Sequence, residues 1–210
     1  MFTNKSTFKK LAKSAYKAGN LFIGLTEDMY IIQSNYWRME VRQMFLDKQH
    51  KAALVELVGD LPETGTIYRY EDGEQAERLE DTPICSLAKT WNNMKRSLTA
   101  THISVNTIGN ATLRMMEDVQ TGEKVYVNGV FPAMIRTSAV QEEEGETYPD
   151  KDPRTDGLRC IWSNNVMSFM CYLRRPRYQE EQALVDILEA FELAYGFTSE
   201  NEIEHGEDAR

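Results

Sequence analysis

One segment carries clustered carboxylates of the kind that hold a hard cation. Residues 150–157 read DKDPRTDG, with three aspartates ahead of a glycine. Ca²⁺ prefers carboxylate oxygens, but the usual calcium loop spaces its ligands at two-residue intervals and ends on a glutamate. Here a proline and an arginine interrupt the spacing, and Leu158 begins an apolar run. The segment therefore predicts a solvated acidic loop, and we expect no bound metal ion.

Nucleophilic catalysis would need a serine, threonine or cysteine beside a base, with a third group that orients the base. The three histidines, His50, His102 and His205, are scattered, and no nucleophile motif is present. The glycines lie apart, so no phosphate-cradling loop is predicted. We expect no catalytic residue and no cofactor. A metal-dependent hydrolase stays open as an alternative, which would require carboxylates with altered pKa in a pocket.

The three cysteines match neither a zinc motif nor a disulfide framework. Cys85, Cys160 and Cys171 are an odd number, and each lies in apolar sequence. Free cysteine in such a context usually behaves as a small apolar side chain. The pattern predicts three buried thiols.

Acidic residues are concentrated in a few segments. The formal net charge is -9, and most of the 33 acidic residues lie in residues 71–81, 142–156 and 199–210. Such segments predict a surface that steers a basic protein partner, although acidic loops also serve simply to keep a protein soluble. The acidic residues expected to bind the partner are Glu71, Asp72, Glu74, Glu142, Glu143, Glu144, Glu146, Asp150 and Asp152.

Basic residues suggest a different partner. The first 20 residues hold five lysines and no acid, and RRPR occupies residues 174–177. Lysine and arginine neutralise backbone phosphates, which makes direct contact with nucleic acid the alternative. The sequence pI near 5.0 is opposite to the basic footprint expected of such a domain. The residues of this alternative site are Lys9, Lys13, Lys17, Arg174, Arg175 and Arg177.

Hydrophobic periodicity predicts the elements that would position these residues. Helices are expected at about 6–18, 43–58, 82–94 and 184–195. Strands are expected at about 21–25, 29–34, 37–41, 66–70, 101–106, 111–117, 123–131, 158–162 and 166–173, with residues 141–157 as an exposed loop. Strand alternation places Trp37 and Met39 inside and Arg38 outside.

Runs of strands between helices predict an α+β fold with antiparallel or mixed sheets and about four helices. We expect a single domain over residues 1–198, with sub-halves 1–80 and 81–198, and an acidic flexible tail at 199–210. Both halves open with a helix followed by three strands. As an order of elements, without a residue motif, this resembles the repeated units of DNA sliding clamps.

No apolar run approaches the roughly 20 residues of a membrane-spanning helix, and the start lacks a secretion signal. We therefore expect a cytoplasmic protein without a membrane partner. The main hypothesis is a non-enzymatic acidic protein that binds a basic surface. In concrete form, it is a phage or mobile-element inhibitor that occupies the nucleic-acid channel of a host nuclease. The alternative is a nucleic-acid-associated accessory protein that resembles a sliding clamp.

Overall fold

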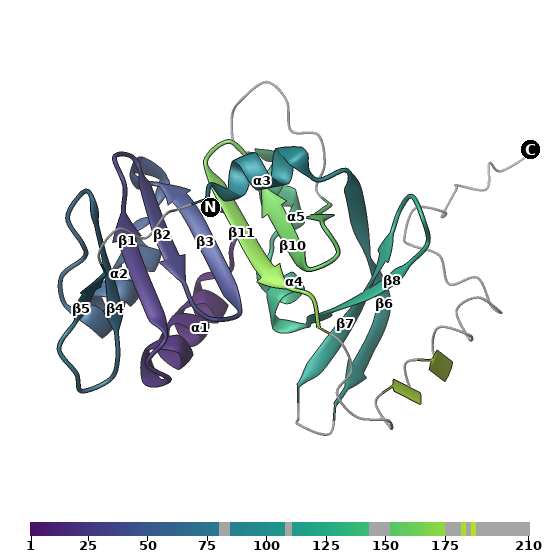
Figure 1. Cartoon of the computed structure of the whole chain (residues 1–210), viewed down its shortest axis with the longest axis horizontal. Coiled ribbons are helices and arrows are strands. Elements are labelled where there is room, and N and C mark those ends of the chain that lie inside the picture. Colours follow the sequence, from purple (N-terminus) through teal and green to yellow (C-terminus); the bar gives the residue numbers. More distant parts are fainter. Residues whose placement is uncertain (80–84, 108–110, 143–151, 175–181, 184–185, 188–210) are drawn as a thin grey trace, which may run out of the picture.

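A computed structural model describes residues 1–79, 85–107, 111–142, 152–174, 182–183 and 186–187 (Figure 1). No helix among these residues is long and apolar enough to cross a membrane.

The first half opens with helix α1 (Lys5–Lys17) and a three-stranded meander. The Asn4 side chain caps the helix by accepting hydrogen bonds from two backbone N–H groups, and Gly19 ends it at a φ of 64°. The meander consists of β1 (Leu21–Leu25), β2 (Met29–Gln33) and β3 (Trp37–Arg42). A short 3₁₀ turn, η1 (Gln43–Phe45), leads to helix α2 (Lys48–Val58), which Asp47 caps.

The chain then returns to the sheet beside its first strand. Strand β4 (Thr66–Tyr70) pairs with β1, and the short β5 (Glu77–Leu79) pairs with β4. The second half also begins with a helix and three strands. After α3 (Leu87–Asn93) come β6 (Arg96–Asn106), β7 (Thr112–Asp118) and β8 (Lys124–Asn128), then α4 (Val130–Met134) and α5 (Thr137–Glu142). Strand β9 (Arg154–Thr155) lies beside β6 as β4 lies beside β1, and β10 (Arg159–Ser163) and β11 (Met167–Tyr172) follow.

The two halves share one continuous sheet. Its strand order is β5-β4-β1-β2-β3-β11-β10-β9-β6-β7-β8, and every pair of named strands is antiparallel. The halves meet where β3 pairs with β11, with Trp37 opposite Cys171 and Val41 opposite Met167. A substantial apolar core extends across this junction and includes Phe8, Trp37 and Phe169.

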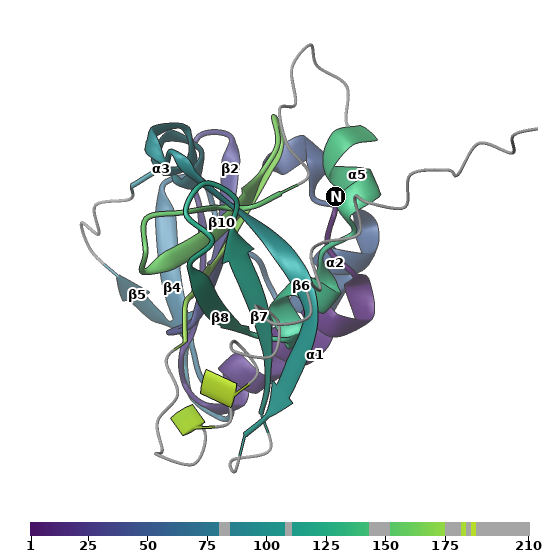
Figure 2. The same ribbon diagram turned by 90° about the vertical axis from the view of Figure 1, so that its right-hand side faces the viewer.

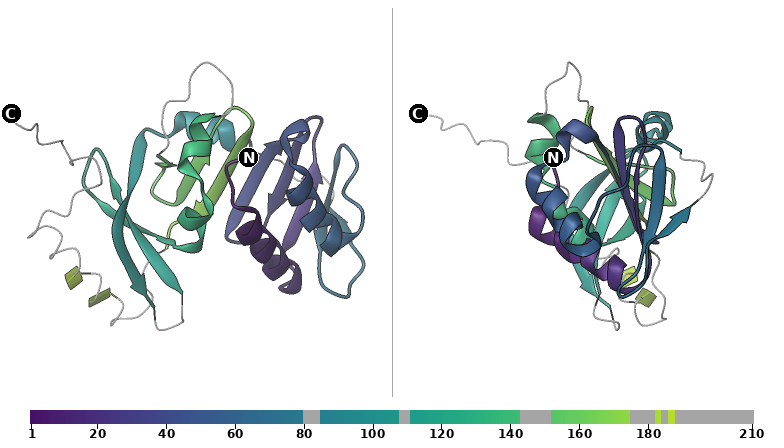
Figure 3. Two further views of the ribbon diagram at one scale, coloured as in Figure 1. Left: turned by 180° about the vertical axis from the view of Figure 1, so that it is seen from behind. Right: turned by 90° about the vertical axis from the view of Figure 1, so that its left-hand side faces the viewer.

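Most helices cover one face of this sheet. Figures 2 and 3 show α1, α2, α4 and α5 on the same side, which we call the helix-side face. Helix α3 lies on the opposite face, where Leu87, Trp91 and Met94 pack against Ile161 and Met170. Helices from both halves therefore contribute to the helix-side face.

The first residues of the chain join the two halves. Phe2 is fully buried, and Thr3 forms a bridge with Ile135. The Asn4 N–H donates to the Met134 carbonyl, and the Arg136 N–H donates to the Phe2 carbonyl, each at 2.7 Å. The start of α1 is thus anchored to the α4–α5 segment of the second half.

The predicted fold class is wrong. In the described residues, eleven antiparallel strands form one sheet, and only α1, α2 and α3 among the helices have seven or more residues. A balanced α+β fold with four helices is therefore excluded, because the strands of both halves merge into a single sheet. The predicted helix at 184–195 and the acidic tail at 199–210 fall largely or wholly outside the described residues. The sub-halves 1–80 and 81–198 stay a prediction.

Three local predictions also need correction. Residues 130–131, expected at the end of a strand over 123–131, instead begin α4, where Pro132 sits in the first turn and its missing N–H costs nothing. Residues 154–155, expected in a loop, form β9. Cys85 is exposed, whereas Cys160 and Cys171 are buried as expected.

Candidate nucleic-acid interface and docking groove

The outer surfaces of α1 and α2 form a lysine face. Its members are Lys5, Lys9, Lys10, Lys13 and Lys17 of α1 and Lys48 and Lys51 of α2, all of them exposed. The two helices lie side by side, since Lys9 Nζ on α1 is 2.5 Å from Glu56 Oε2 on α2. This hydrogen bond from Lys9 lowers the pKa of Glu56 below its usual value. The apolar side of α1, with Phe8, Ala12 and Ala15, packs on the core and orients the lysines outward.

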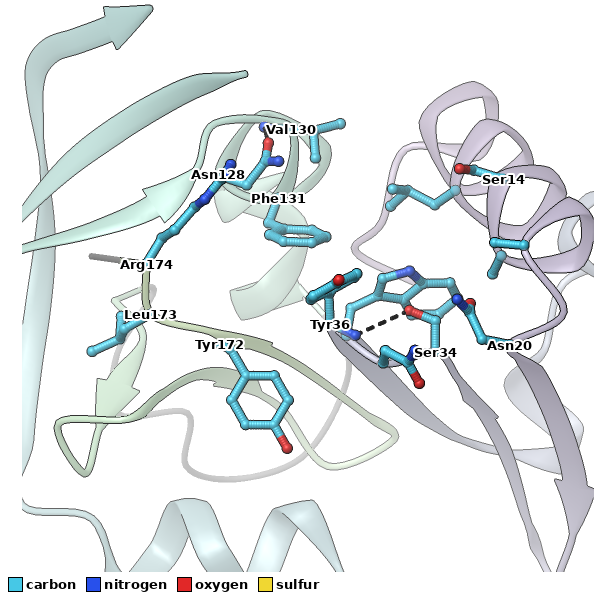
Figure 4. A pocket seen from close by; sticks show the side chains of 15 residues that line it. Ser14, Asn20, Ser34, Tyr36, Asn128, Val130, Phe131, Tyr172, Leu173 and Arg174 are labelled. Carbon is cyan, nitrogen blue, oxygen red and sulfur yellow. Dashed lines mark hydrogen bonds between the residues drawn. The ribbon is translucent and has the colours of Figure 1, made fainter. Parts of the chain in front are cut away.

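A groove of about 760 Å³ runs between α1 and the second half (Figure 4). Ser14 of α1 and Ala18, which caps the end of that helix, line one wall, and Leu173 and Arg174, which follow β11, lie on the other side. Arg174 is held there because its backbone N–H donates to the Tyr126 carbonyl at 2.6 Å. The structure therefore places α1 and Arg174 across one groove, whereas Arg175 and Arg177 lie outside the described residues.

Four aromatic side chains contribute to the lining of the groove. Phe131 and Trp37 form a buried part of its lining, while Tyr36 and Tyr172 are 62% and 47% exposed. The two tyrosines are tied together at the junction of the halves, because the Tyr172 N–H donates to the Tyr36 carbonyl at 3.2 Å. Among the described residues that line the groove there is no carboxylate. The arrangement can accept an apolar or aromatic side chain beside an acidic one.

The predicted acidic site is only partly described. Glu71, Asp72 and Glu74 are exposed in and next to the β4–β5 turn, where Glu71 lies 3.4 Å from the Arg69 guanidinium. Asp152 is half-buried. The side chains of Glu142, Glu143, Glu144, Glu146 and Asp150 lie outside the described residues. The role of these residues as a partner-binding site stays a prediction.

A buried network has the connectivity of a hydrolase triad. The Asp47 carboxylate is 2.9 Å from His50 Nδ1, and His50 Nε2 is 3.1 Å from Thr3 Oγ1. Thr3 and His50 are buried, so a substrate has no access to the hydroxyl. Burial lowers the pKa of His50 below its usual value, although the Asp47 carboxylate opposes this shift. The network therefore fixes the first residues of the chain onto α2.

One buried carboxylate lines a smaller cavity on the opposite face. Glu40, 3% exposed, borders a space of about 300 Å³ together with Asp28 and Ser168. Burial raises the pKa of Glu40, and the Arg38 guanidinium opposes the shift. Both carboxylate oxygens have partners, because one pairs with Arg38 and the other accepts the Leu87 N–H at 2.9 Å. Glu40 therefore fastens α3 to β3.

Arg38 was expected in solvent, but its side chain is only 13% exposed because it pairs with Glu40. Trp37 and Met39 are buried, as predicted. No group of three or more potential metal-ligating side chains occurs in the described part of the chain. Sequence reasoning missed the pairing of Tyr36 with Tyr172, which lie in segments far apart in the chain. The one available signal was the run of large aromatic residues at 36–37.

The sequence matches no protein-family model and no curated protein. Weak structural similarity exists to bacterial beta sliding clamps. The Helicobacter pylori beta clamp bound to a DNA ligase peptide has a TM-score of 0.34 and 8% identity, over 86% of this chain and 68% of that chain. The same clamp in complex with 3,4-difluorobenzamide has a TM-score of 0.32 and 10% identity, over 86% of this chain and 66% of that chain. The beta subunit from the DNA polymerase of Streptococcus pyogenes has a TM-score of 0.31 and 9% identity, over 87% of this chain and 66% of that chain. The chain thus spans about two thirds of the length of these clamps, and scores this low carry no argument about function.

Proposed function

We propose that this protein is a nucleic-acid-associated accessory protein whose lysine face contacts the phosphate backbone. The observation that carries the proposal is the segregation of seven exposed lysines on two adjacent helices of a chain with a net charge of -9. Only Glu56 is described in an ion pair with one of them. Such a surface attracts phosphates locally even where the overall charge is negative, because screening limits the reach of distant carboxylates to about 10 Å at 0.1 M salt. In this proposal the protein associates with nucleic acid in a clamp-like manner.

The test compares two matched double variants. Lys13→Gln with Lys17→Gln removes two charges from the lysine face. Lys89→Gln with Lys95→Gln removes two exposed lysines, one on α3 and one two residues after it, and α3 lies on the opposite side of the sheet (Figure 2). Binding of a labelled duplex of mixed sequence is followed by fluorescence anisotropy between 50 and 200 mM salt, the range over which phosphate contacts show on the order of 10³-fold effects. We expect the first variant to lose about tenfold or more in affinity and to lower the salt slope by about 2.

The second variant should bind as the wild type does. Equal binding by both variants, or a wild type that binds neither duplex nor single strand, would reject the proposal. Circular dichroism on both variants checks that the fold is intact.

A second candidate function is docking of a partner peptide in the aromatic groove. Exposed tyrosines that line a concave surface are typical anchors of protein interfaces. Lys10 and Lys17 lie one helical turn either side of Ser14, so with Arg174 they place positive charge around the groove. We propose as occupant an extended peptide with one aromatic or aliphatic anchor flanked by carboxylates.

The groove is tested with Tyr36→Ala and Tyr172→Ala against a labelled panel of such peptides. We expect each substitution to weaken the best peptide about fivefold or more, as for hot-spot anchors. Met44→Ala is the control, because Met44 is an exposed apolar residue that does not line the groove. Peptides that bind all four proteins equally, or none of them, would remove this function.

The acidic-partner hypothesis, with its nuclease-inhibitor form, has only the composition of the acidic segments in its support. Three of its nine residues have described exposed side chains, and these belong to one turn region. Salt-dependent binding to plain duplex DNA distinguishes the nucleic-acid-associated protein from the nuclease inhibitor, because the inhibitor hypothesis predicts no such binding.

A further inference from the structure

A second cavity on the helix-side face lies in the other half of the molecule. It has a volume of about 550 Å³ and is lined by Ser104, Thr112, Arg114, Val130 and Pro132 among others. Arg114 is two residues before Met116, which is buried in the core beneath the helices, so both point to the same face of β7. Val130 also lines the aromatic groove, whose far wall is α1. The cavity therefore continues the surface that begins at the lysine face.

Arg114 keeps most of its hydrogen-bonding capacity for a ligand. Its Nη1 donates to Ser104 Oγ at 3.2 Å and weakly to the His102 carbonyl at 3.5 Å. Within the described residues, Nε and Nη2 have no hydrogen-bond partner. The planar guanidinium fork matches the oxygens of a phosphate better than any other side chain does. Among the described residues that line the cavity there is no carboxylate to compete.

The neighbouring hydroxyl can add a donor. Ser104 is exposed, and its oxygen already accepts from Arg114, which leaves its own proton available. The Thr112 hydroxyl, by contrast, donates to Asn106 Oδ1 at 2.8 Å. One guanidinium and one hydroxyl thus converge from adjacent strands, because Arg114 lies directly opposite Ser104 in the β6–β7 pairing.

We propose that this cavity holds a backbone phosphate of the same nucleic acid that crosses the lysine face. The inference rests on the proposed function and adds a contact from the second half. It predicts that the footprint spans both halves of the sheet, with Arg114 as a phosphate-binding residue and Ser104 as its positioning residue.

The experiment uses the full chain and the labelled duplex of mixed sequence. Arg114→Gln removes the charge and the fork, and Arg114→Lys keeps the charge alone. Arg42→Gln is the matched control, because Arg42 is exposed and lies on the opposite face, next to Val166. We expect Arg114→Gln to weaken binding about tenfold and to lower the salt slope by about 1, since one phosphate contact is lost. Arg114→Lys should weaken binding with the slope preserved, and Arg42→Gln should match the wild type.

The outcomes separate this inference from the proposed function. If the lysine-face variant loses binding while Arg114→Gln equals Arg42→Gln in affinity and slope, the inference fails alone. If the wild type does not bind duplex, both fail. Sodium tripolyphosphate serves as a free-phosphate probe. Arg114-dependent binding of tripolyphosphate, together with unchanged duplex affinity in Arg114→Gln, would overturn the nucleic-acid source of the phosphate.

Discussion

The Asp47–His50–Thr3 network shows how residue types suited to catalysis can serve structure. The connectivity is that of a nucleophile, a base and an orienting carboxylate, but the hydroxyl and the imidazole are buried. With the ring neutral and its proton on Nδ1, which lies 2.9 Å from the Asp47 carboxylate, Nε2 can accept the hydroxyl proton of Thr3. Protonation of Nε2 would replace that acceptor with a donor. The network is therefore sensitive to acid.

This sensitivity gives a pH prediction. Because burial lowers the pKa of folded His50 below its unfolded value of about 6.5, the unfolded chain binds more protons as the pH falls below that value. The free energy of unfolding should then decrease between pH 7 and pH 5. His50→Gln should show a smaller decrease over this range in urea denaturation. Lys51→Gln, an exposed substitution on the same helix, should keep the wild-type slope. Identical slopes in all three proteins would contradict the assignment.

Single residues were predictable where local alternation decides their position. Trp37 and Met39 point inward as predicted, because a strand alternates its side chains. The partners of charged residues were not predictable in this way. Arg38 meets Glu40 on the same strand, and Glu40 reaches the start of α3, 47 residues away. Arg114 was likewise overlooked, since nothing in its local sequence reveals the cavity beside it.

At the scale of elements, most strands of the meanders were predictable. β1, β2, β3, β4 and β7 lie within about a residue or two of their predicted bounds, because apolar and β-branched runs bounded by turns identify such strands. The short elements β5, β9 and α5 were missed. Elements of two to six residues have little propensity of their own, and here they depend on neighbours distant in sequence.

The pairing of β1 with β4 depends on a glycine. A Cβ at Gly24 would lie 2.6 Å from Ile67 Cγ1 and 3.2 Å from the Thr66 carbonyl oxygen. Gly24→Ala should therefore lower the free energy of unfolding by about 1–3 kcal/mol, the usual cost of overpacking. In an Ile67→Ala background the same change should cost less, because the closest contact is gone. Urea denaturation of the four proteins of this double-mutant cycle measures the difference, and equal costs in both backgrounds would refute the packing explanation.

At the scale of the whole molecule, the order of elements indicated two similar halves, but not how they join. The sheet is continuous because β3 pairs with β11 and one core lies beneath both. No local pattern encodes that pairing, since the two strands are separated by most of the second half. For the same reason the expected fold class was wrong, although its individual strands were largely right. The positive charge of α1 was predictable from the sequence. The structure shows that Lys48 and Lys51 of α2 extend the same lysine face.

The junction between β3 and β11 also bears on how the protein is made. While the ribosome is still extending the chain, β3 has no neighbour on its outer side, and the hydrogen-bonding groups along that edge stay unpaired. At roughly 5–20 residues per second, the ribosome completes β11 roughly 6–25 s after β3. During that interval the nascent first half lacks the Phe169 ring that stacks on Trp37, and it carries an unpaired strand edge at which two growing chains can mispair.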